Sequence, residues 1–454
     1  MRELPEGWEW TISGDVCSSV RDGTHDTPKY LDNGIPLITS KNLKSGKIDF
    51  STAKLISIND HQQISVRSGV DDGDILFAMI GTIGNPVIVN KEKPFSIKNV
   101  ALFKKNPSIV ESRYLRCWLS SYSLERILEE DKFIKGTTQK FIPLNNLRNL
   151  PIPLPPLNEQ KRIADRLDQL LTRIDKTKAH LDRIPPLLKR FRQSVLAAAT
   201  SGKLTADWRE EKSEPDWLVA NAEDVCEWIT KGTTPSKDKM YELVGEIPYI
   251  KVYNLCFDGS LDFTINPTFI DRNTHEVVLK RSKIFPGDVL MNIVGPPLGK
   301  VSIVPSLYPE WNINQAIALF RVKNRIKNTF LAYVLMNEKM IAEIVMKSKA
   351  TAGQFNVTLE ICRAIEIPVP SLSEQQEIVR RVEALFAKAD RIEAQYKNAR
   401  QQVDRLTPAL LAKAFRGELV PQDPKDEPAS VLLERVKEAR SIAQPAKAKR
   451  KAVK

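Results

Sequence analysis

A heptad pattern near the end of the chain constrains the fold more than any other feature of the sequence. Between residues 374 and 420, apolar or small side chains recur at alternating steps of four and three residues, which is the spacing of a coiled-coil seam. The seam consists of Ile378, Val382, Leu385, Ala389, Ile392, Tyr396, Ala399, Val403, Leu406 and Leu410. A helix with such a seam needs a partner helix to bury it.

The same chain contains a second helix of this kind. Between residues 159 and 184 the seam consists of Ile163, Leu167, Leu170, Ile174, Thr177, Leu181 and Ile184. The segments that lead into the two helices also match, because IPLPPLNEQ at 152–160 resembles IPVPSLSEQ at 367–375, an offset of 367 − 152 = 215 residues. A period this long indicates a duplicated domain with its helix, not a solenoid repeat of about 20 to 50 residues.

Two globular blocks, at residues 1–150 and 206–365, repeat a common plan with a more diverged sequence. Short β-like runs recur at matched places: IPLI at 35–38 matches IPYI at 247–250, and GDIL at 73–76 matches GDVL at 287–290. Turn residues match as well, since RDGT at 21–24 resembles TKGT at 230–233, and GTTQKF at 136–141 resembles TAGQF at 351–355. These runs, with one helix expected over 111–130, predict α+β blocks with modest cores.

The predicted fold is therefore α+β, with two similar globular domains separated by two long helices that form an antiparallel coiled coil, as a pseudo-twofold internal repeat. The predicted segments are a first domain at 1–150, a helical region at 151–205, a second domain at 206–365, a helical region at 366–420, and a short helix with a basic disordered tail at 421–454. The proline-rich links before the helices cannot be helical. Asn158 and Ser373 are the predicted N-caps of the helices that follow.

The charge of the chain favours a polyanionic partner. The formal net charge is +12 and the isoelectric point about 9.3, although a basic charge alone is as compatible with no such partner. No run approaches the ~18 apolar residues of a membrane span, and the N-terminus lacks a signal-peptide pattern, so we expect a cytoplasmic protein without membrane contact. The five scattered cysteines predict reduced thiols, and the four histidines show no metal-ligand spacing.

Motifs for catalysis are missing from the sequence. The nearest approach to a phosphate-binding loop, GPPLGKV at 295–301, is one residue too short, lacks the hydroxyl residue, and carries two prolines that have no amide hydrogen to donate. There is no G-x-G-x-x-G after a strand, no H-E-x-x-H, no G-x-S-x-G, and no Asn/Asp-Pro-Pro-aromatic tetrapeptide of the kind that positions an amino group for methylation. The chain is predicted to read or to scaffold, with no cofactor or metal of its own.

The length of the seam suggests how two such domains would be used. From Ile378 to Leu410 the seam covers 33 residues, which is roughly 50 Å at about 1.5 Å per residue. At about 3.4 Å per base pair, this length corresponds to somewhat more than one turn of duplex. Two basic domains held apart in this way are predicted to read two separated patches of double-stranded DNA, with a spacing set by the helices.

Base edges are read by Arg, Lys, Asn, Gln, Ser and Thr side chains that reach into a groove. Turn-rich stretches supply these residue types at matched places in both domains, although any one stretch is more often an ordinary surface loop. The candidate DNA-binding residues are Arg21, Thr24, Lys29, Ser40, Lys41, Asn42, Thr138, Gln139 and Lys140 in the first domain, and Lys231, Thr233, Thr234, Lys237, Lys251, Tyr253, Asn254 and Gln354 in the second.

Several of these segments together resemble a known family. The sequence LPEGW at 4–8, the run from IPLPPLNEQKRIADRLDQLL at 152–171 to SGKLTADWR at 201–209, and SEQQEIVRRVEALFAKADRIE at 373–393 are similar to the DNA-specificity subunit of type I restriction-modification systems. They resemble in particular the subgroup typified by the enteric K-12 type enzyme. The resemblance covers the chain to about residue 420, and the two helical regions carry most of it.

This resemblance implies more than the residues do alone. It implies that the two blocks are target recognition domains, and that the helical regions form a spacer and dock methylation subunits. Such a specificity subunit is not catalytic. It assembles with two modification subunits that use S-adenosylmethionine to methylate adenine, and with two restriction subunits that use ATP and magnesium to translocate and cut DNA. The implied target is bipartite and asymmetric, with a nonspecific spacer.

Two other functions remain open at this point. One is a coiled-coil interaction scaffold whose basic charge is incidental and which does not bind DNA sequence-specifically. The other is a fused restriction-modification enzyme, which the missing methylase and ATPase motifs argue against. A steep loss of DNA affinity with rising salt distinguishes a phosphate-contacting protein from a scaffold.

Overall fold

The chain folds into two compact units in the computed structural model, which describes residues 3–44, 46–295, 297–349 and 356–443. Unit 1 comprises Met1–Leu181 together with Asn398–Lys454, and unit 2 comprises Asp182–Lys397. Each unit therefore combines one globular domain with its own stretches of long helix.

Unit 1 is built around a four-stranded antiparallel sheet with the order β2-β10-β7-β8. The strands are β2 (Val20–Asp22), β10 (Val100–Phe103), β7 (Ile75–Ala78) and β8 (Gly84–Ile88). Every residue of β7 and β10 is buried, because successive side chains point to opposite faces and both faces are covered. Phe77 and Phe103 pack into a cluster with the helices, whereas Leu76 and Leu102 pack into a second cluster with Ile38.

Smaller elements surround this sheet. A three-stranded sheet with the order β6-β3-β9 and a two-stranded hairpin β4-β5 lie beside it in unit 1. Their bounds are β3 (Ile35–Ile38), β4 (Leu43–Lys44), β5 (Lys47–Ile48), β6 (Lys54–Ile56) and β9 (Ser96–Ile97). The short helices are α1 (Ser13–Val16), α2 (Ile58–Ser68), α3 (Ser112–Leu119), α4 (Tyr122–Glu130) and α5 (Leu144–Arg148).

The single helix expected over 111–130 is wrong in one respect. The structure has two helices, α3 and α4, with a break at Ser120 and Ser121. The Ser121 side chain accepts a hydrogen bond from the Leu124 amide at 3.2 Å, so it caps a new helix. A serine that can compete with the backbone for hydrogen bonds ends one helix and starts the next.

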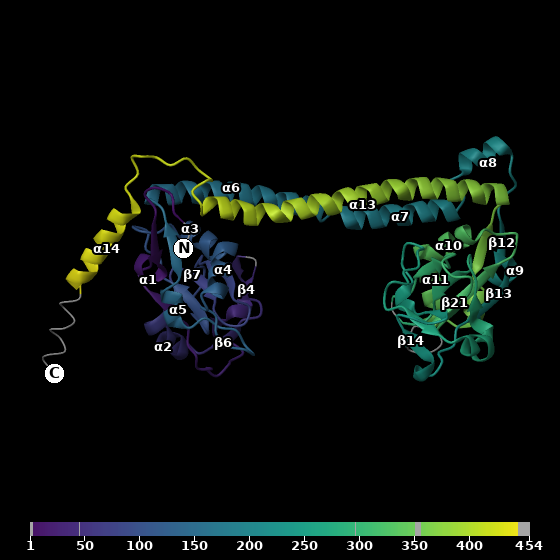
Figure 1. The fold of residues 1–454 in the computed structure, drawn as a ribbon, viewed down its shortest axis with the longest axis horizontal. Helices are drawn as coiled ribbons and strands as arrows, with labels where there is room; N and C mark the ends of the chain where they lie inside the picture. Colours follow the sequence, from purple (N-terminus) through teal and green to yellow (C-terminus); the bar gives the residue numbers. More distant parts are fainter. Residues whose placement is uncertain (1–2, 45, 296, 350–355, 444–454) are drawn as a thin grey trace. The chain divides into compact units, whose positions relative to one another are not determined.

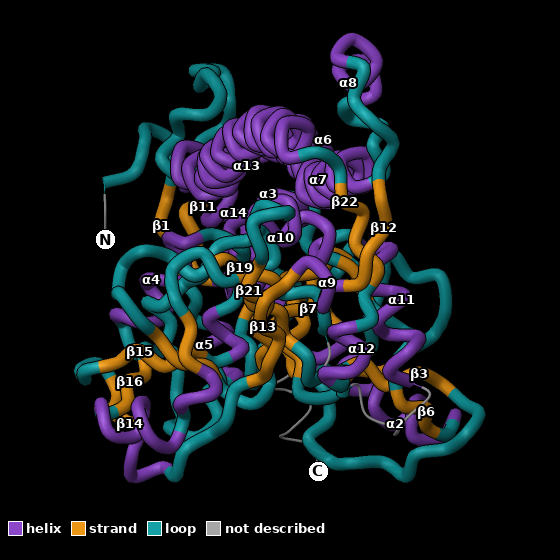
Figure 2. The backbone as a smooth tube through the Cα atoms, turned by 90° about the vertical axis from the view of Figure 1, so that its right-hand side faces the viewer, coloured by secondary structure: helices purple, strands orange, loops and turns teal. Residues whose placement is uncertain are grey.

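The proline-rich links form strands, which the sequence did not predict. In unit 1, β11 (Pro151–Leu154) pairs antiparallel with β1 (Glu9–Ile12). In unit 2, β22 (Glu366–Val369) pairs with β12 (Leu218–Asn221), and the two lie side by side in Figure 2. Proline is tolerated because each sheet has only two strands, so a missing amide hydrogen can face away from the partner.

Unit 2 repeats the plan of unit 1. Its four-stranded sheet has the order β13-β21-β18-β19, which corresponds strand by strand to β2-β10-β7-β8. These strands are β13 (Cys226–Lys231), β21 (Ile317–Val322), β18 (Val289–Asn292) and β19 (Val301–Ile303). A five-stranded sheet has the order β14-β16-β15-β20-β17, with β14 (Met240–Glu242), β15 (Ile247–Ile250), β16 (Thr268–Ile270), β17 (Lys283–Ile284) and β20 (Trp311–Ile313). The helices are α8 (Ala206–Lys212), α9 (Ala222–Val225), α10 (Asn328–Met336), α11 (Glu338–Lys349) and α12 (Leu359–Arg363).

The long helices pair antiparallel within each unit (Figure 1). In unit 1, α6 (Leu157–Leu181) lies along the last part of α13 (Leu372–Ala414), and Lys178 forms an ion pair with Asp404 at 3.0 Å. In unit 2, α7 (Ile184–Thr200) lies along the first part of α13, and Arg192 forms an ion pair with Asp390 at 2.7 Å. The helix is interrupted between α6 and α7. Pro185 and Pro186 occupy the first turn of α7, where proline is tolerated.

The seam residues divide into buried and exposed ones. The buried ones are Ile163, Leu167, Ile174, Ile378, Val382 and Ala389. All but Ile174 and Ala389 belong to the core cluster of a domain. Leu170, Leu181, Leu385 and Val403 are partly buried. Ile392 and Leu406 are each 46% exposed, contrary to the predicted seam. Ile378 and Leu385 join the core of a domain as well as facing a helix, whereas Ile392 and Leu406 belong to no buried cluster among the described residues.

The N-caps differ slightly from the prediction. Both helices begin two residues earlier than predicted, at Leu157 and Leu372. In α13 the Ser371 hydroxyl, not Ser373, accepts a hydrogen bond from the Glu374 amide at 3.1 Å. All five cysteines are free thiols, and four of them are buried. Within the described ranges, none of the helices combines the length and the apolar character that a membrane span requires.

Candidate nucleic-acid interface

The predicted DNA-binding loops leave the four-stranded sheet of each unit at the same end. In unit 1, Ala78 at the end of β7 is opposite both Val100, which starts β10, and Gly84, which starts β8. Asp22 at the end of β2 is opposite Ala101. The segments that follow β2 and β7, and those that precede β8 and β10, therefore emerge together. We call this the loop end of the sheet.

Unit 2 has the same loop end. Lys231 at the end of β13 is opposite Ala318 of β21. Asn292 at the end of β18 is opposite Ile317, which starts β21. Because the register is the same in both sheets, the matched loops of the two domains are held by matched backbone positions. Each domain thus presents a set of loops on a rigid antiparallel scaffold.

A glycine in each unit allows the first loop to cross closely over the end of another strand, β9 in unit 1 and β20 in unit 2. A Cβ atom on Gly23 would lie 2.3 Å from the Ile97 carbonyl oxygen, and one on Gly232 would lie 2.1 Å from that of Asn314. Since real side chains do not approach backbone so closely, only glycine fits. In unit 1 this approach lets the Thr24 amide donate to the Ile97 carbonyl at 3.0 Å.

Side chains then fix this loop against the residues that follow β9 and β20. In unit 1, His25 Nδ1 lies 2.9 Å from Asn99 Oδ1, and the Ser40 hydroxyl donates to the Asn99 carbonyl at 3.4 Å. In unit 2, the Thr234 hydroxyl contacts the Gln315 amide oxygen. The candidate stretches around residues 21–29 and 39–44 thus converge on Asn99.

Asn42 and Asn254, both candidates for base reading, are buried in the second candidate loop of their domain and bond to its backbone. Asn42 is 3% exposed and Asn254 is fully buried. Each amide oxygen accepts a backbone amide three residues earlier, from Thr39 and Lys251, both at 2.9 Å. Their amide nitrogens donate to the Asp49 carbonyl at 3.0 Å and to the Ile265 carbonyl at 2.8 Å. These amides shape the loops, and the neighbouring Lys41 and Tyr253 are the exposed side chains.

The third candidate loop is fastened to the turn between β7 and β8. The Gly81 amide donates to the Lys140 carbonyl at 2.9 Å, and the Ile142 amide donates to the Met79 carbonyl at 2.9 Å. Thr138, Gln139 and Lys140 are all exposed. The matched bond in unit 2 joins the Val357 amide to the Ile293 carbonyl at 2.8 Å. Gln354, the candidate in the corresponding loop, lies outside the described residues.

Cations at the loop ends are available to a ligand. Thr24 and Ser40 are partly buried, as is Lys251, whereas Thr233 and Thr234 are exposed. Exposed lysines and arginines without an ion pair to any described residue are Arg21, Lys29, Lys41, Lys140, Lys231 and Lys237. Arg21 and Lys231 lie within β2 and β13, and the other four lie outside the strands. Unpaired cations of this kind are suited to phosphate groups of a nucleic acid. By contrast, Asp22 is buried and committed to Arg67 and His25.

Three potential metal ligands lie within 4.8 Å of one another in unit 2, namely His275, Glu276 and Glu310. Their geometry is that of an ion network. Asn312 Nδ2 lies 3.1 Å from His275 Nδ1, so the proton sits on Nε2, which donates to Glu310 at 3.1 Å. Arg272 donates to Glu310 at 2.8 Å, and this bond lowers the pKa of the Glu310 carboxyl. Burial lowers the pKa of His275, and Lys283 pairs with Glu276.

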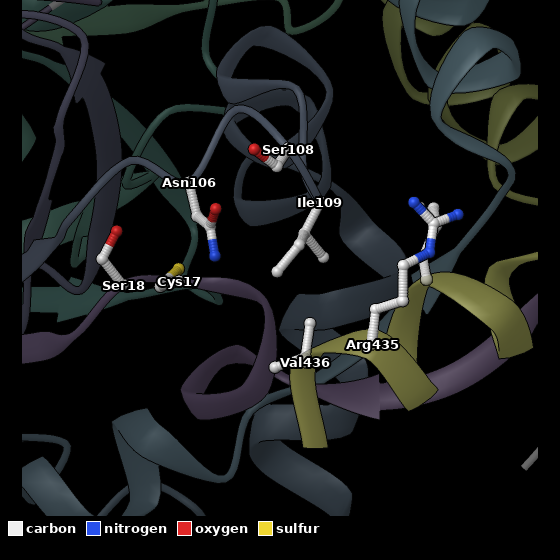
Figure 3. A pocket seen from close by; sticks show the side chains of 8 residues that line it. Cys17, Ser18, Asn106, Ser108, Ile109, Arg435 and Val436 are labelled. Carbon is white, nitrogen blue, oxygen red and sulfur yellow. The ribbon is translucent and has the colours of Figure 1, made fainter. Parts of the chain in front are cut away.

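A cavity of about 360 Å³ in unit 1 lies at the opposite end of the sheet. It separates α14 (Ala429–Ala443) from the segments just before β2 and just after β10 (Figure 3). Its lining residues are Cys17, Ser18, Asn106, Ser108, Ile109, Leu432, Arg435 and Val436. Since these segments flank Val20 and Phe103, which pair at the end away from the loops, the cavity is separate from the candidate interface.

Sequence analysis did not identify the β7–β8 and β18–β19 turns as part of the loop ends. Residues 295–301 were assessed only against a phosphate-binding loop. The sequence nevertheless contained a sign of these turns, because Gly81 and Gly295 each lie eight residues after the first glycine of the GDIL and GDVL runs. Both adopt a positive φ, +78° and +81°, as glycine does in tight turns.

Comparisons with known proteins agree with this architecture. The family model for the type I restriction modification DNA specificity domain matches residues 5–185 and 214–400. The EcoKI specificity subunit of Escherichia coli K12 is 32% identical over 480 aligned positions, which cover 99% of this chain and 99% of that protein. The EcoBI specificity subunit of Escherichia coli is 38% identical over 341 positions, 70% of each chain.

A solved structure has the same fold. A chain from a study of complex assembly and conformational transition in the type I R-M system matches with a TM-score of 0.69. The match covers 92% of this chain and 100% of that chain, at 20% sequence identity. At this identity the likeness concerns the fold alone, with two similar domains and long helices.

Proposed function

Because this chain belongs to the family of type I restriction-modification DNA specificity subunits, we propose that the loop end of each sheet is the surface with which it reads DNA. The chain is a non-catalytic, sequence-specific DNA-recognition subunit of a type I restriction-modification system. The observation that carries the assignment of the surface is the identical strand register of the two sheets, which sends matched loops to one end in each unit.

Each domain contributes one half of the recognition site in this proposal. The exposed cations of the loop ends contact phosphates and set the register on the duplex, and the polar side chains among them read base edges. Since the loops differ between the two domains while the scaffold is the same, the two half-sites differ in sequence. The target is therefore bipartite and asymmetric, with a spacer that neither domain reads.

The chain works in a complex with methylase and restriction subunits and DNA. We propose that two modification subunits and two restriction subunits assemble with it in the cytoplasm, one of each kind per repeat. We expect S-adenosylmethionine to be bound by the modification subunits, and ATP and magnesium by the restriction subunits. Methylation of adenine and cleavage of DNA then occur in the partner subunits.

Two exposed cations test the proposed surface. We expect Arg21→Ala and Lys140→Ala, made in the complex with the modification subunits, each to weaken binding to the recognised duplex. Each removes a phosphate contact, so the slope of log affinity against log salt falls by about one. Thermal unfolding should be unchanged, because neither side chain has an ion-pair partner among the described residues. Fluorescence anisotropy over a salt series measures both quantities.

Lys105→Ala is the matched control. Lys105 is exposed, has no ion-pair partner in the described part of unit 1, and follows β10 at the end of the sheet away from the loops. We expect it to bind DNA as the wild type does. Unchanged affinity in both test variants contradicts the assignment of the loop end. A wild-type complex without preference for any duplex sequence favours the alternative, a coiled-coil scaffold.

A further inference from the structure

Residues 297–300, from the segment that fails as a phosphate-binding loop, lead into β19. A buried asparagine at the end of β18, Asn292, holds them in place. The amide oxygen of Asn292 accepts the Lys300 amide at 2.9 Å, and its amide nitrogen donates to the Pro297 carbonyl at 3.0 Å. Asn292 is 2% exposed. The backbone of Lys300 is therefore fixed at the loop end of unit 2.

The side chain of Lys300 lies among aromatic residues. Its ammonium is 3.4 Å from the Val252 carbonyl and 5.7 Å from the ring centre of Phe257, which is 54% exposed. On the neighbouring loop, Lys251 lies 6.0 Å from the ring centre of Tyr253. Two cations and two partly exposed rings thus form a polar and aromatic cluster at the loop end. Aromatic rings and cations together are suited to contacts with bases and phosphates.

Backbone bonds keep this cluster in place. The Ile303 amide of β19 donates to the Gly259 carbonyl at 3.1 Å, and the Cys256 amide donates to the Ser302 hydroxyl at 3.3 Å. The loop that carries Phe257 is thereby tied to the strand that begins just after Lys300. These backbone bonds therefore fix the position of the Lys300 backbone relative to the loop that carries Phe257.

The matched position in unit 1 is Asn85. Ile303 of β19 is opposite Val289, and Ile88 of β8 is opposite Ile75, so counting back along the sequence from these pairs aligns Gly84-Asn85 with Gly299-Lys300. A register shift between Leu76 and Ala78 makes Asn85 part of a bulge and places Gly84 opposite Ala78. Asn85 is exposed and adopts φ = +48°, a conformation that asparagine tolerates better than most residues. Asn85 and Lys140 line the same hollow at the loop end of unit 1.

We propose that Asn85 and Lys300 are specificity-determining residues, each of which reads a base edge in the half-site of its own domain. This inference rests on the proposed function of the loop ends. Asparagine pairs with adenine through N6 and N7, and lysine pairs with guanine through O6 and N7. One structural position on a repeated scaffold therefore carries two different reading chemistries. This difference accounts for part of the asymmetry between the half-sites.

Selection from randomised duplexes tests the proposal. The complex with the modification subunits is prepared with wild-type chain, Asn85→Ala, Lys300→Ala or Lys300→Arg, and bound DNA is sequenced. We expect Lys300→Ala to lower affinity about tenfold and to relax the preference at a guanine of one half-site only. Asn85→Ala should relax an adenine in the other half-site. Lys300→Arg, which also pairs with guanine, should retain the wild-type preference.

Arg325→Ala is the control, because Arg325 is exposed, has no ion-pair partner among the described residues, and follows β21 at the end of the sheet away from the loops. It should leave the selected sequence and the affinity unchanged. A structural role for Lys300 would reduce hydrogen-exchange protection over residues 251–260 in Lys300→Ala, and that result overturns the proposal. A uniform loss of affinity across all sequences, with the preference kept, assigns Lys300 to phosphate alone and also overturns it. If the wild type selects no sequence, the proposed function itself fails.

Discussion

At the scale of single residues, the repeat places the same side chain in two different environments. Glu159 and Glu374 occupy matched positions at the start of α6 and α13, and they are 1% and 0% exposed. Each accepts a hydrogen bond from a tryptophan Nε1, from Trp8 at 3.2 Å and from Trp217 at 2.8 Å. Both bonds join the helix to the polypeptide that starts the globular domain.

The two carboxylates differ in their remaining partners. Glu374 also accepts from the Thr205 hydroxyl at 2.7 Å and from Arg209 Nε at 3.0 Å. Oε1 of Glu159 has no hydrogen-bond partner among the described residues. Burial raises the pKa of Glu159 above its ordinary value, although the bond from Trp8, the charge of Arg162 and the Gln422 side chain act in the other direction. The buried charge of Glu374 is therefore more fully compensated than that of Glu159.

The same substitution is therefore expected to have different effects at the two positions. Glu374→Gln loses charged hydrogen bonds to Thr205 and Arg209, and we expect unit 2 to lose about 2 kcal/mol of stability. Glu159→Gln keeps an acceptor for Trp8 and removes a buried charge that is only partly compensated, so unit 1 should be as stable as the wild type or more stable at pH 7. Hydrogen exchange followed by mass spectrometry measures each unit separately.

The pH dependence gives a second check on Glu159. A carboxyl whose pKa is raised by folding binds its proton more tightly in the folded state, so its stabilising effect is complete below the unfolded pKa near 4.5 and is lost as pH rises through the folded pKa. The stability of Glu159→Gln relative to the wild type should therefore be more favourable at pH 7 than at pH 4.5. If the difference in stability between Glu159→Gln and the wild type is the same at pH 4.5 and at pH 7, folding does not raise the pKa of Glu159.

At the scale of elements, the sequence predicted what depends on local pattern. The strands IPLI at 35–38 and ILFA at 75–78 follow from apolar runs bounded by turn residues. The pairing of β11 with β1 could not be predicted, because it joins residues more than a hundred positions apart and uses prolines. Likewise, the burial of Asn42 depends on bonds to Asp49 and Thr52, which a residue-type argument cannot foresee.

The close approach of Gly23 and Gly232 to neighbouring backbone gives a prediction for the first loop of each domain. A methyl group at Gly23 or Gly232 would meet backbone carbonyl oxygens at 2.3 Å and 2.1 Å, so Gly23→Ala and Gly232→Ala should displace the first loop of their own domain. Because the scaffold strands remain, we expect the fold to persist and recognition of one half-site to be lost in each case. Selection of bound duplexes, with the far-ultraviolet circular dichroism spectrum recorded for each variant, measures both effects.

Gly46→Ala is the comparison for the loss of stability that Gly23→Ala causes. A Cβ on Gly46 would meet nothing within 4 Å, so only its positive φ of 73° opposes the change. We expect a cost of about 1 kcal/mol or slightly more, from conformation alone. If Gly23→Ala costs no more than Gly46→Ala and leaves both half-sites recognised, the close approach of the first loop to Ile97 is not required for reading DNA.

At the scale of the whole molecule, the duplication allowed the architecture to be read from sequence. The offset of 215 residues between the two IP-x-P segments predicted two equivalent domains and two equivalent helices, and both are present. The unbroken seam from Ile378 to Leu410 predicted one long helix, and α13 carries residues of both units, from Leu372 in unit 2 to Ala414 in unit 1. Its partner is interrupted between Leu181 and Ile184. Continuity is a tertiary outcome, since Pro408 lies inside α13 despite the usual cost of a helical proline.

The helices also predict how the spacing of the half-sites responds to deletion. The ion pairs Lys178–Asp404 and Arg192–Asp390 mark one contact in each unit. The two contacts are 14 positions apart on both sides of the helix pair, since 192 − 178 = 14 and 404 − 390 = 14. Removing residues 182–188 together with 394–400 deletes one heptad from each side and keeps both ion pairs in register.

This paired deletion shortens the helical region by about 10 Å, at about 1.5 Å per residue, which corresponds to about three base pairs. A heptad turns a helix by only about 20° relative to the seam, whereas three base pairs turn the duplex by about 100° at about 10.5 base pairs per turn. We therefore expect a best spacer shorter by about three base pairs, bound more weakly than the original because the two half-sites no longer face the protein equally. Duplexes with spacers varied one base pair at a time measure this. Full affinity at the original spacing would show that the helices do not set the distance between half-sites, even though both domains read DNA.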